Sequence, residues 1–161
     1  MKQEDVLIIG IGNIFRGDDA AGLAAAGLLR ERRLPGVKIL EMDGDITAIA
    51  ADWQGAQRVV VIDAVTSKAP AGTIFRFAAH EKPLPQKMFA TCWSCHVFGV
   101  AQQIEMARAL NQLPPCLIVY GIEGQDFTLG SGLSREVQQA LPRLVEQIQE
   151  DLTGLEKTGE P

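Results

Sequence analysis

A run of β-branched residues near the middle of the chain limits the fold more than any other feature. The run Arg58–Asp63 (Arg-Val-Val-Val-Ile-Asp) has no polar alternation, which predicts a strand buried on both faces. Strands of that kind occur almost only in parallel sheets with helices on each side. Similar runs at Val6–Gly10, Val37–Met42 and Cys116–Ile122 are separated by longer stretches with helical spacing. We therefore predict an α/β fold, a three-layer α/β/α sandwich with a mostly parallel twisted sheet.

The remaining segments complete this pattern within one domain. Hydrophobic spacing and turn residues predict helices at Asp18–Leu34, Asp45–Trp53, His96–Leu110 and Ser134–Leu155. The second of these helices would be N-capped by Asp45 or Thr47. Thr73–Phe77 reads as a strand near a sheet edge, and His80–Met88 as a polar loop. A single domain is expected over residues 1–156, with a frayed tail at 157–161.

Charge and hydropathy exclude several classes of partner. The net charge of −5 and pI near 5.0 leave no excess of Lys or Arg to neutralise nucleic-acid phosphates or an anionic membrane surface. No apolar run approaches the roughly 18 residues of a membrane span, and the polar start of the chain is unlike a signal peptide. The odd number of cysteines (Cys92, Cys95 and Cys116) is typical of a reducing compartment. The expected location is the cytoplasm.

Acidic residues gather where the predicted strands end. Asp43, Asp63 and Glu123 lie at or just past strand ends, while Asp18 and Asp19 open the helix after the first strand. In parallel sheets the carboxyl ends of the strands meet at one edge, which is the usual functional edge of the fold. We expect these carboxylates to share that edge.

Three familiar motifs are either incomplete or lack the context that their usual function needs. Gly10-Ile11-Gly12-Asn13 lacks the third glycine of a dinucleotide fingerprint, since Phe15 stands at that position. Cys92-Trp-Ser-Cys-His96 has the spelling of a haem attachment site, but such attachment needs export. A zinc site from Cys92, Cys95, His96 and Cys116 is stereochemically conceivable, although only one Cys-x-x-Cys pair is present. Packing of Cys92 and Cys95 as small apolar side chains is the simpler interpretation.

The histidines restrict the chemistry further. The chain contains two, His80 and His96, and His80 lies in a polar loop where a solvated side chain is expected. Asp19, Asp63 and His96 each have an ordinary structural explanation when taken singly. Together they could bind a borderline divalent metal and leave coordination positions open for a substrate.

Six short motifs occur along the chain in a recognisable order: Gly10-Ile-Gly-Asn13, Gly17-Asp-Asp19 with Gly22, Val61-Ile-Asp-Ala64, Ser94-x-His96-x-x-Gly99, Val119-Tyr-Gly-Ile-Glu123 and Gly130-Ser-Gly-Leu-Ser134. Together they resemble the motifs of the endopeptidases that mature the large subunit of nickel-iron hydrogenases. These blocks follow the order and spacing of the family and span nearly the whole chain. One departure is Asp43-Gly-Asp45-Ile46, where many relatives have Asp-Gly-Gly-Thr. That difference concerns the substrate more than the reaction.

The resemblance implies an α/β/α sandwich and a defined reaction. Such an enzyme removes a short C-terminal extension from the hydrogenase large-subunit precursor after nickel has been inserted. The family's metal-binding positions fall on Asp19, Asp63 and His96. The nickel is supplied by the substrate, and no permanently bound cofactor is expected. Because a ligating His96 must be neutral, activity should fall below about pH 6.

The sequence leaves two points of mechanism open. The group that activates water is unknown, with Asp18 and Asp43 as candidates. A chaperone that senses nickel and binds the immature subunit without cutting it would need the same three ligands. Another metal-assisted hydrolase, such as an aminopeptidase-like enzyme, would be expected to retain a metal pair.

Overall fold

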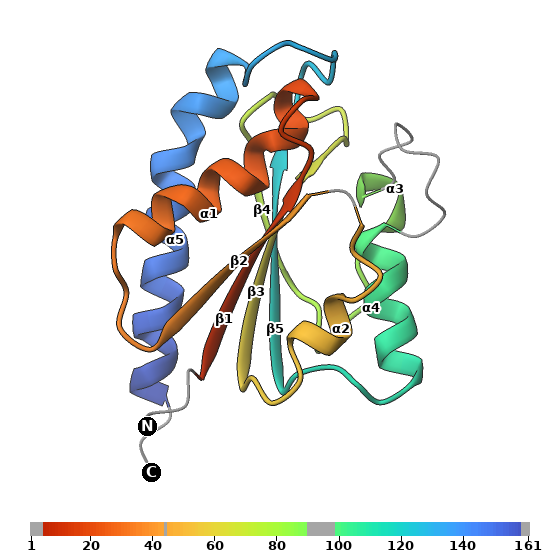
Figure 1. Cartoon of the computed structure of the whole chain (residues 1–161), viewed down its shortest axis with the longest axis vertical. Coiled ribbons are helices and arrows are strands. Elements are labelled where there is room, and N and C mark those ends of the chain that lie inside the picture. Colours follow the sequence, from red (N-terminus) through yellow and green to blue (C-terminus); the bar gives the residue numbers. More distant parts are fainter. Residues whose placement is uncertain (1–4, 44, 90–98, 159–161) are drawn as a thin grey trace.

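The computed structural model describes residues 5–43, 45–89 and 99–158, which form one five-stranded sheet with helices on both faces (Figure 1). The strand order is β2-β1-β3-β5-β4, with parallel pairing throughout except between β4 and β5. The strands are β1 (Val6–Gly12), β2 (Val37–Asp43), β3 (Arg58–Val65), β4 (Ile74–Ala78) and β5 (Cys116–Glu123). The predicted α/β sandwich with a mostly parallel sheet is confirmed, and β4 lies at an edge as expected.

The sheet is buried on both faces because its central strands are apolar at nearly every position. Successive residues of each central strand point to opposite faces. Thus Ile8 of β1 and Ile62 of β3 pack into the core under α1 (Ala21–Glu31) and α5 (Arg135–Thr158). Ile9 and Val61 belong to the core on the other face, under α2 (Ile49–Asp52), α3 (Gln86–Phe89) and α4 (Val100–Ala109). Figure 1 shows these two layers on either side of the sheet.

Two helices differ from their sequence predictions in how they begin. The stretch after β1 begins as a 3-10 turn, η1 (Gly17–Ala20), before α1, which ends at Glu31 rather than Leu34. The predicted helix at Asp45–Trp53 is reduced to α2, and its N-cap Ala48 has no side-chain cap bond. Asp45 Oδ1 instead accepts hydrogen bonds from the N–H (2.9 Å) and Oγ1 (2.7 Å) of Thr47. This local turn competes with a helix start, so the predicted cap was wrong.

Other segments also differ from their predicted bounds. The predicted polar loop His80–Met88 overlaps the short helix α3. Helix α4 begins at Val100, whereas the sequence predicted a helix from His96; residues 96–98 lie outside the described residues. The last helix, α5, continues through Pro142 to Thr158, three residues past its predicted end. Residues 159–161 lie outside the description, so the frayed tail stays a prediction. Within the described part of the chain, no helix is long and apolar enough to cross a bilayer.

Candidate functional site

The carboxyl ends of β1 and β3 form the point at which the sheet changes direction. From β1 the chain passes through α1 to β2 on one side, while β3 leads onward to β4 and β5 on the other. Helix α1 covers one face and α4 the opposite face (Figure 1). A crevice at such a switch point is where open α/β sheets bind ligands. Asp19, in η1 after β1, and Asp63, near the end of β3, belong to the two segments that flank this switch point, and we use the word crevice for the place between these two strand ends.

Close backbone approach at two glycines holds Asp19 over this end of the sheet. A Cβ atom on Gly12 would overlap the carbonyl oxygen of Asp19, and one on Gly22 would overlap the carbonyl oxygens of Ile11 and Ile62. The Asn13 N–H donates to that same Asp19 oxygen at 3.2 Å. A side chain at Gly12 would push η1 away from β1, and one at Gly22 would push the start of α1 away from β1 and β3. Gly12 and Gly22 are therefore required for the close packing of η1 and α1 against the strands.

Asp63 is buried and Asp19 is half-buried, and the negative charge of Asp19 disfavours the ionised form of Asp63. Asp63 is 8% exposed, and its pKa is raised well above the ordinary value, first by burial and then by the negative charge of Asp19. The Ala64 N–H partly offsets this. The pKa of Asp19 is also raised by burial, while Arg16 lowers it and Asp43 raises it. No salt bridge to either aspartate occurs among the described residues. The charge of Arg16 therefore favours the ionised form of Asp19, whereas no cation of the described residues acts in the same way on Asp63.

Asp18 has a different environment although it is the next residue in the chain. It is fully buried, and its carboxylate accepts hydrogen bonds from the N–H groups of Gln125 (2.7 Å), Asp126 (3.0 Å) and Ser134 (2.7 Å). Its own N–H donates to the Asp126 carbonyl at 2.7 Å. Both carboxylate oxygens are engaged, so Asp18 anchors the loop between β5 and α5. This geometry disfavours the water-activating role considered for it.

Asp43 and Glu123 lie at two other strand ends and also differ from each other. Asp43 is exposed at the end of β2, next to Gly12 in the sheet register, and its charge acts on Asp19. Glu123 is 3% exposed and accepts hydrogen bonds from the N–H (2.8 Å) and Oγ (2.7 Å) of Ser67. Glu123 therefore fixes the turn after β3, whereas Asp43 remains open to solvent beside the crevice.

The third sequence candidate for the metal, His96, lies outside the described residues, as do Cys92 and Cys95. Within residues 5–43, 45–89 and 99–158, no three His, Cys, Asp or Glu side chains lie close enough to hold a metal ion. The ligand set Asp19, Asp63 and His96 thus stays a prediction, of which the structure places two members at one crevice.

His80 is not the solvated loop residue that the sequence suggested. Its Nδ1 lies 3.1 Å from both the N–H and the carbonyl oxygen of Leu117, and its ring is half-buried. Because β4 and β5 are antiparallel at this point, the imidazole continues their pairing beyond the last residue of β4. His80 is far along β5 from the carboxyl-end rim, which leaves it outside the site.

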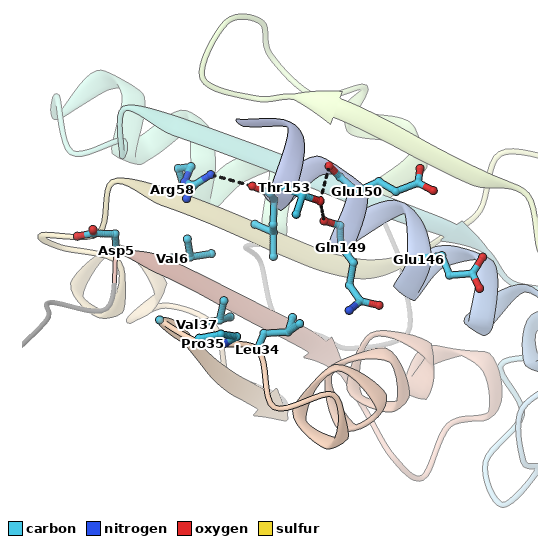
Figure 2. A pocket seen from close by; sticks show the side chains of 12 residues that line it. Asp5, Val6, Leu34, Pro35, Val37, Arg58, Glu146, Gln149, Glu150 and Thr153 are labelled. Atoms are coloured by element: carbon cyan, nitrogen blue, oxygen red, sulfur yellow. Dashed lines mark hydrogen bonds between the residues drawn. The ribbon is translucent and has the colours of Figure 1, made fainter. Parts of the chain in front are cut away.

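A pocket of about 860 Å³ lies at the opposite, amino end of the strands (Figure 2). Asp5, Val6, Val37 and Arg58 line it beside the last turns of α5, where Arg58 donates to the Leu152 carbonyl oxygen at 3.3 Å. None of the carboxylates at the crevice reaches this pocket. Because the candidate site carboxylates do not line this pocket, we do not assign the catalytic site to it, although it is large.

Comparison with known proteins decides the family. The model of the hydrogenase maturation protease family matches residues 28–151. The chain belongs to the hydrogenase maturation protease family. It is therefore a hydrolase, an endopeptidase. The hydrogenase 2 maturation protease of Escherichia coli is 25% identical over 157 residues, which cover 96% of this chain and 92% of that protein.

Solved structures of similar proteins support the same assignment. An endopeptidase from Escherichia coli superposes with a TM-score of 0.79 at 26% identity, covering 96% of this chain and 93% of that one. A nickel-iron hydrogenase maturation protease from Thermococcus kodakarensis gives a TM-score of 0.68 at 26% identity, with 94% of each chain covered. The five-stranded sheet and its flanking helices are the fold of this protease family.

The sequence did not reveal two features of this maturation protease site. Arg16, the N-cap residue of η1, is the cation whose charge lowers the pKa of Asp19. Nothing in its sequence neighbourhood distinguishes it from an ordinary surface arginine. The anchoring role of Asp18 was also hidden, because its donors come from residues more than a hundred positions away. Only the fold brings those partners together.

Proposed function

We propose that this endopeptidase removes the C-terminal extension from a nickel-loaded precursor of the nickel-iron hydrogenase large subunit. The observation that carries the proposal is the pair of carboxylates at the switch point, the half-buried Asp19 and the buried Asp63, whose pKa values are raised by burial and by neighbouring negative charge. A divalent cation delivered by the substrate would relieve this repulsion. His96 would complete the ligand set, since carboxylate oxygens and an imidazole nitrogen suit a borderline metal such as nickel.

In this proposal the precursor brings the nickel to the enzyme. Held by Asp19, Asp63 and His96, it would report that insertion is complete and bring the scissile peptide bond to the crevice. The metal would then polarise the peptide carbonyl or lower the pKa of a bound water. Asp43 is the stronger of the two candidates for activating that water, because the Asp18 carboxylate already accepts three backbone N–H bonds.

A cleavage assay on the large-subunit precursor tests the proposal. Nickel-loaded and nickel-free precursor are incubated with the wild-type chain and with His96→Ala, and the products are measured by intact mass. We expect only the loaded precursor to lose a C-terminal peptide, and His96→Ala to leave it intact. A matched His80→Ala variant should still cut, because His80 lies away from the crevice.

Two results would contradict the proposal. Equal cleavage of the nickel-free precursor would remove the metal-recognition step. Binding of the loaded precursor without any cleavage by the wild-type chain would favour a nickel-sensing chaperone of the immature subunit.

A further inference from the structure

Large apolar side chains are exposed next to the crevice. Among the described residues, five large hydrophobic side chains are exposed, and three of them are Ile14 (61%), Phe15 (70%) and Leu129 (62%). They come from two loops, one after β1 and one after β5, that are joined by the Gly130 N–H donating to the Phe15 carbonyl oxygen at 2.9 Å. We call Ile14, Phe15 and Leu129 the apolar rim. A cluster of this kind in contact with water is typical of a binding surface.

Local hydrogen bonds hold the apolar rim in one shape. Asn13 Oδ1 accepts the Phe15 N–H at 2.9 Å, and the Asn13 carbonyl oxygen accepts the Arg16 N–H at 3.2 Å. The loop that carries Leu129 is fixed by the three bonds to the buried Asp18 carboxylate. A surface ordered in advance loses little conformational entropy on binding. The exposure of these side chains is therefore imposed by the fold.

The apolar rim adjoins the crevice directly. The Asp19 N–H donates to the Arg16 carbonyl oxygen at 3.0 Å, so the turn that presents Phe15 also positions Asp19. A pocket of about 540 Å³, lined by Arg16 and residues 125–129, opens at the same place. A polypeptide whose scissile bond lies at Asp19 must leave the crevice across a neighbouring surface, and this one is continuous with it.

Charge separates the two surfaces. The crevice carries the carboxylates of Asp19, Asp43 and Asp63, which suit a cation. The loops of the apolar rim, residues 13–17 and 124–134, contain one basic residue, Arg16, and one exposed acidic residue, Asp126, so their charges balance. Basic peptide segments would be drawn to the crevice carboxylates, whereas an uncharged apolar segment would gain most from Phe15 and Leu129.

We propose that the apolar rim binds an extended, apolar segment of the precursor polypeptide next to its scissile bond. This inference rests on the proposed function and adds the surface that selects the peptide. Phe15 and Leu129 would contact large apolar side chains of the substrate and so set its affinity, while Asp19, Asp63 and His96 act on the metal. The apolar rim does not take part in the chemical step.

Steady-state cleavage of the nickel-loaded precursor tests this division. The variants are Phe15→Ser, Leu129→Ser and the double variant, with Met106→Ser and Leu110→Ser as matched controls. The two controls are exposed at 45% and 60% and lie at the far end of α4. We expect each rim variant to raise KM about tenfold or more with kcat changed less than about twofold. The control variants should retain wild-type KM, and all variants should bind Ni²⁺ alone with wild-type affinity.

Three outcomes separate this proposal from its alternatives. If the wild-type chain cuts but the rim variants keep the KM of the controls, the apolar rim does not bind substrate. If the wild-type chain cuts neither precursor form, the proposed function fails, and titration of the precursor against the same variants still decides whether the rim binds it. If the double variant converts a dimer into a monomer by sedimentation while KM is unchanged, the rim is an interface between copies of this chain.

Discussion

Two pairs of carboxylates at the carboxyl end of the sheet differ in the partners that the fold gives them. Asp18 and Glu123 are satisfied by hydrogen bonds from loops that they fix in place. Asp19 and Asp63 face each other's charge at the crevice, and burial raises their pKa values. Buried polar groups with full partners rigidify a fold, while buried charges without a counter-charge mark functional sites. Burial alone therefore does not distinguish an anchor from a ligand; the donors around it do.

The largest effect should follow from changing Asp63. We expect Asp63→Asn to lower the cleavage rate roughly a thousandfold, equivalent to about 4 kcal/mol, because a metal ligand is lost. Its free energy of unfolding should be unchanged or slightly higher, since a buried charge and its repulsion with Asp19 are removed. Rates by intact mass and urea denaturation measure the two quantities. Asp52→Asn, an exposed carboxylate on α2, is the control. If Asp63→Asn lowered the free energy of unfolding by several kcal/mol, Asp63 would be a structural anchor like Asp18 and the contrast between the two residues would be wrong.

The same chemical change at Asp18 should act on stability. Asp18→Asn replaces one accepting oxygen by an NH₂ group, which cannot accept the N–H bonds of the β5–α5 loop. We expect the free energy of unfolding to fall by about 2–4 kcal/mol. Urea denaturation at pH 7 gives the value, and cleavage at low temperature, where the variant remains folded, should stay within about tenfold of wild type. A stable but inactive Asp18→Asn would place Asp18 in the chemistry.

The pH dependence of stability offers a finer test. Because the pKa of Asp63 is raised in the folded state, the folded chain keeps a proton that the unfolded chain releases above about pH 4. The stabilisation is complete below that unfolded-state pKa and is lost as pH rises through the folded-state pKa. We expect the metal-free wild-type chain to lose up to about 1.4 kcal/mol per pH unit more than Asp63→Asn across this window. Parallel pH profiles of the free energy of unfolding for the two proteins would mean that folding does not raise the pKa of Asp63.

The smallest effect concerns Glu123, the second anchor. Glu123→Gln can keep one of its two hydrogen bonds to Ser67, so we expect a loss of about 1 kcal/mol in the free energy of unfolding. A double-mutant cycle with Ser67→Ala should show that the two changes are not additive, because they remove the same contact. Wild-type cleavage is expected throughout. Additive effects on stability would indicate that Glu123 acts through some other contact.

The sequence predicted the architecture because its signals are local. The β-branched run Arg58–Asp63 required a strand buried on both faces, and β3 is that strand. The helix predicted from Asp45 failed because a short turn made by Asp45 and Thr47 competes with a helix start. Hydrophobic periodicity predicts long strands and helices well, but it predicts short helices poorly when local side-chain hydrogen bonds decide where they begin.

The sequence by itself determined which residue types stand at the ends of which strands, and hence that Asp19, Asp43 and Asp63 would meet at one edge. It could not rank them. Whether a carboxylate is an anchor or a site residue depends on donors brought from distant segments, as with Ser134 for Asp18 and Ser67 for Glu123. Those contacts exist only after the chain has folded, because hydrogen bonds and burial depend on position in space and not on order in the chain.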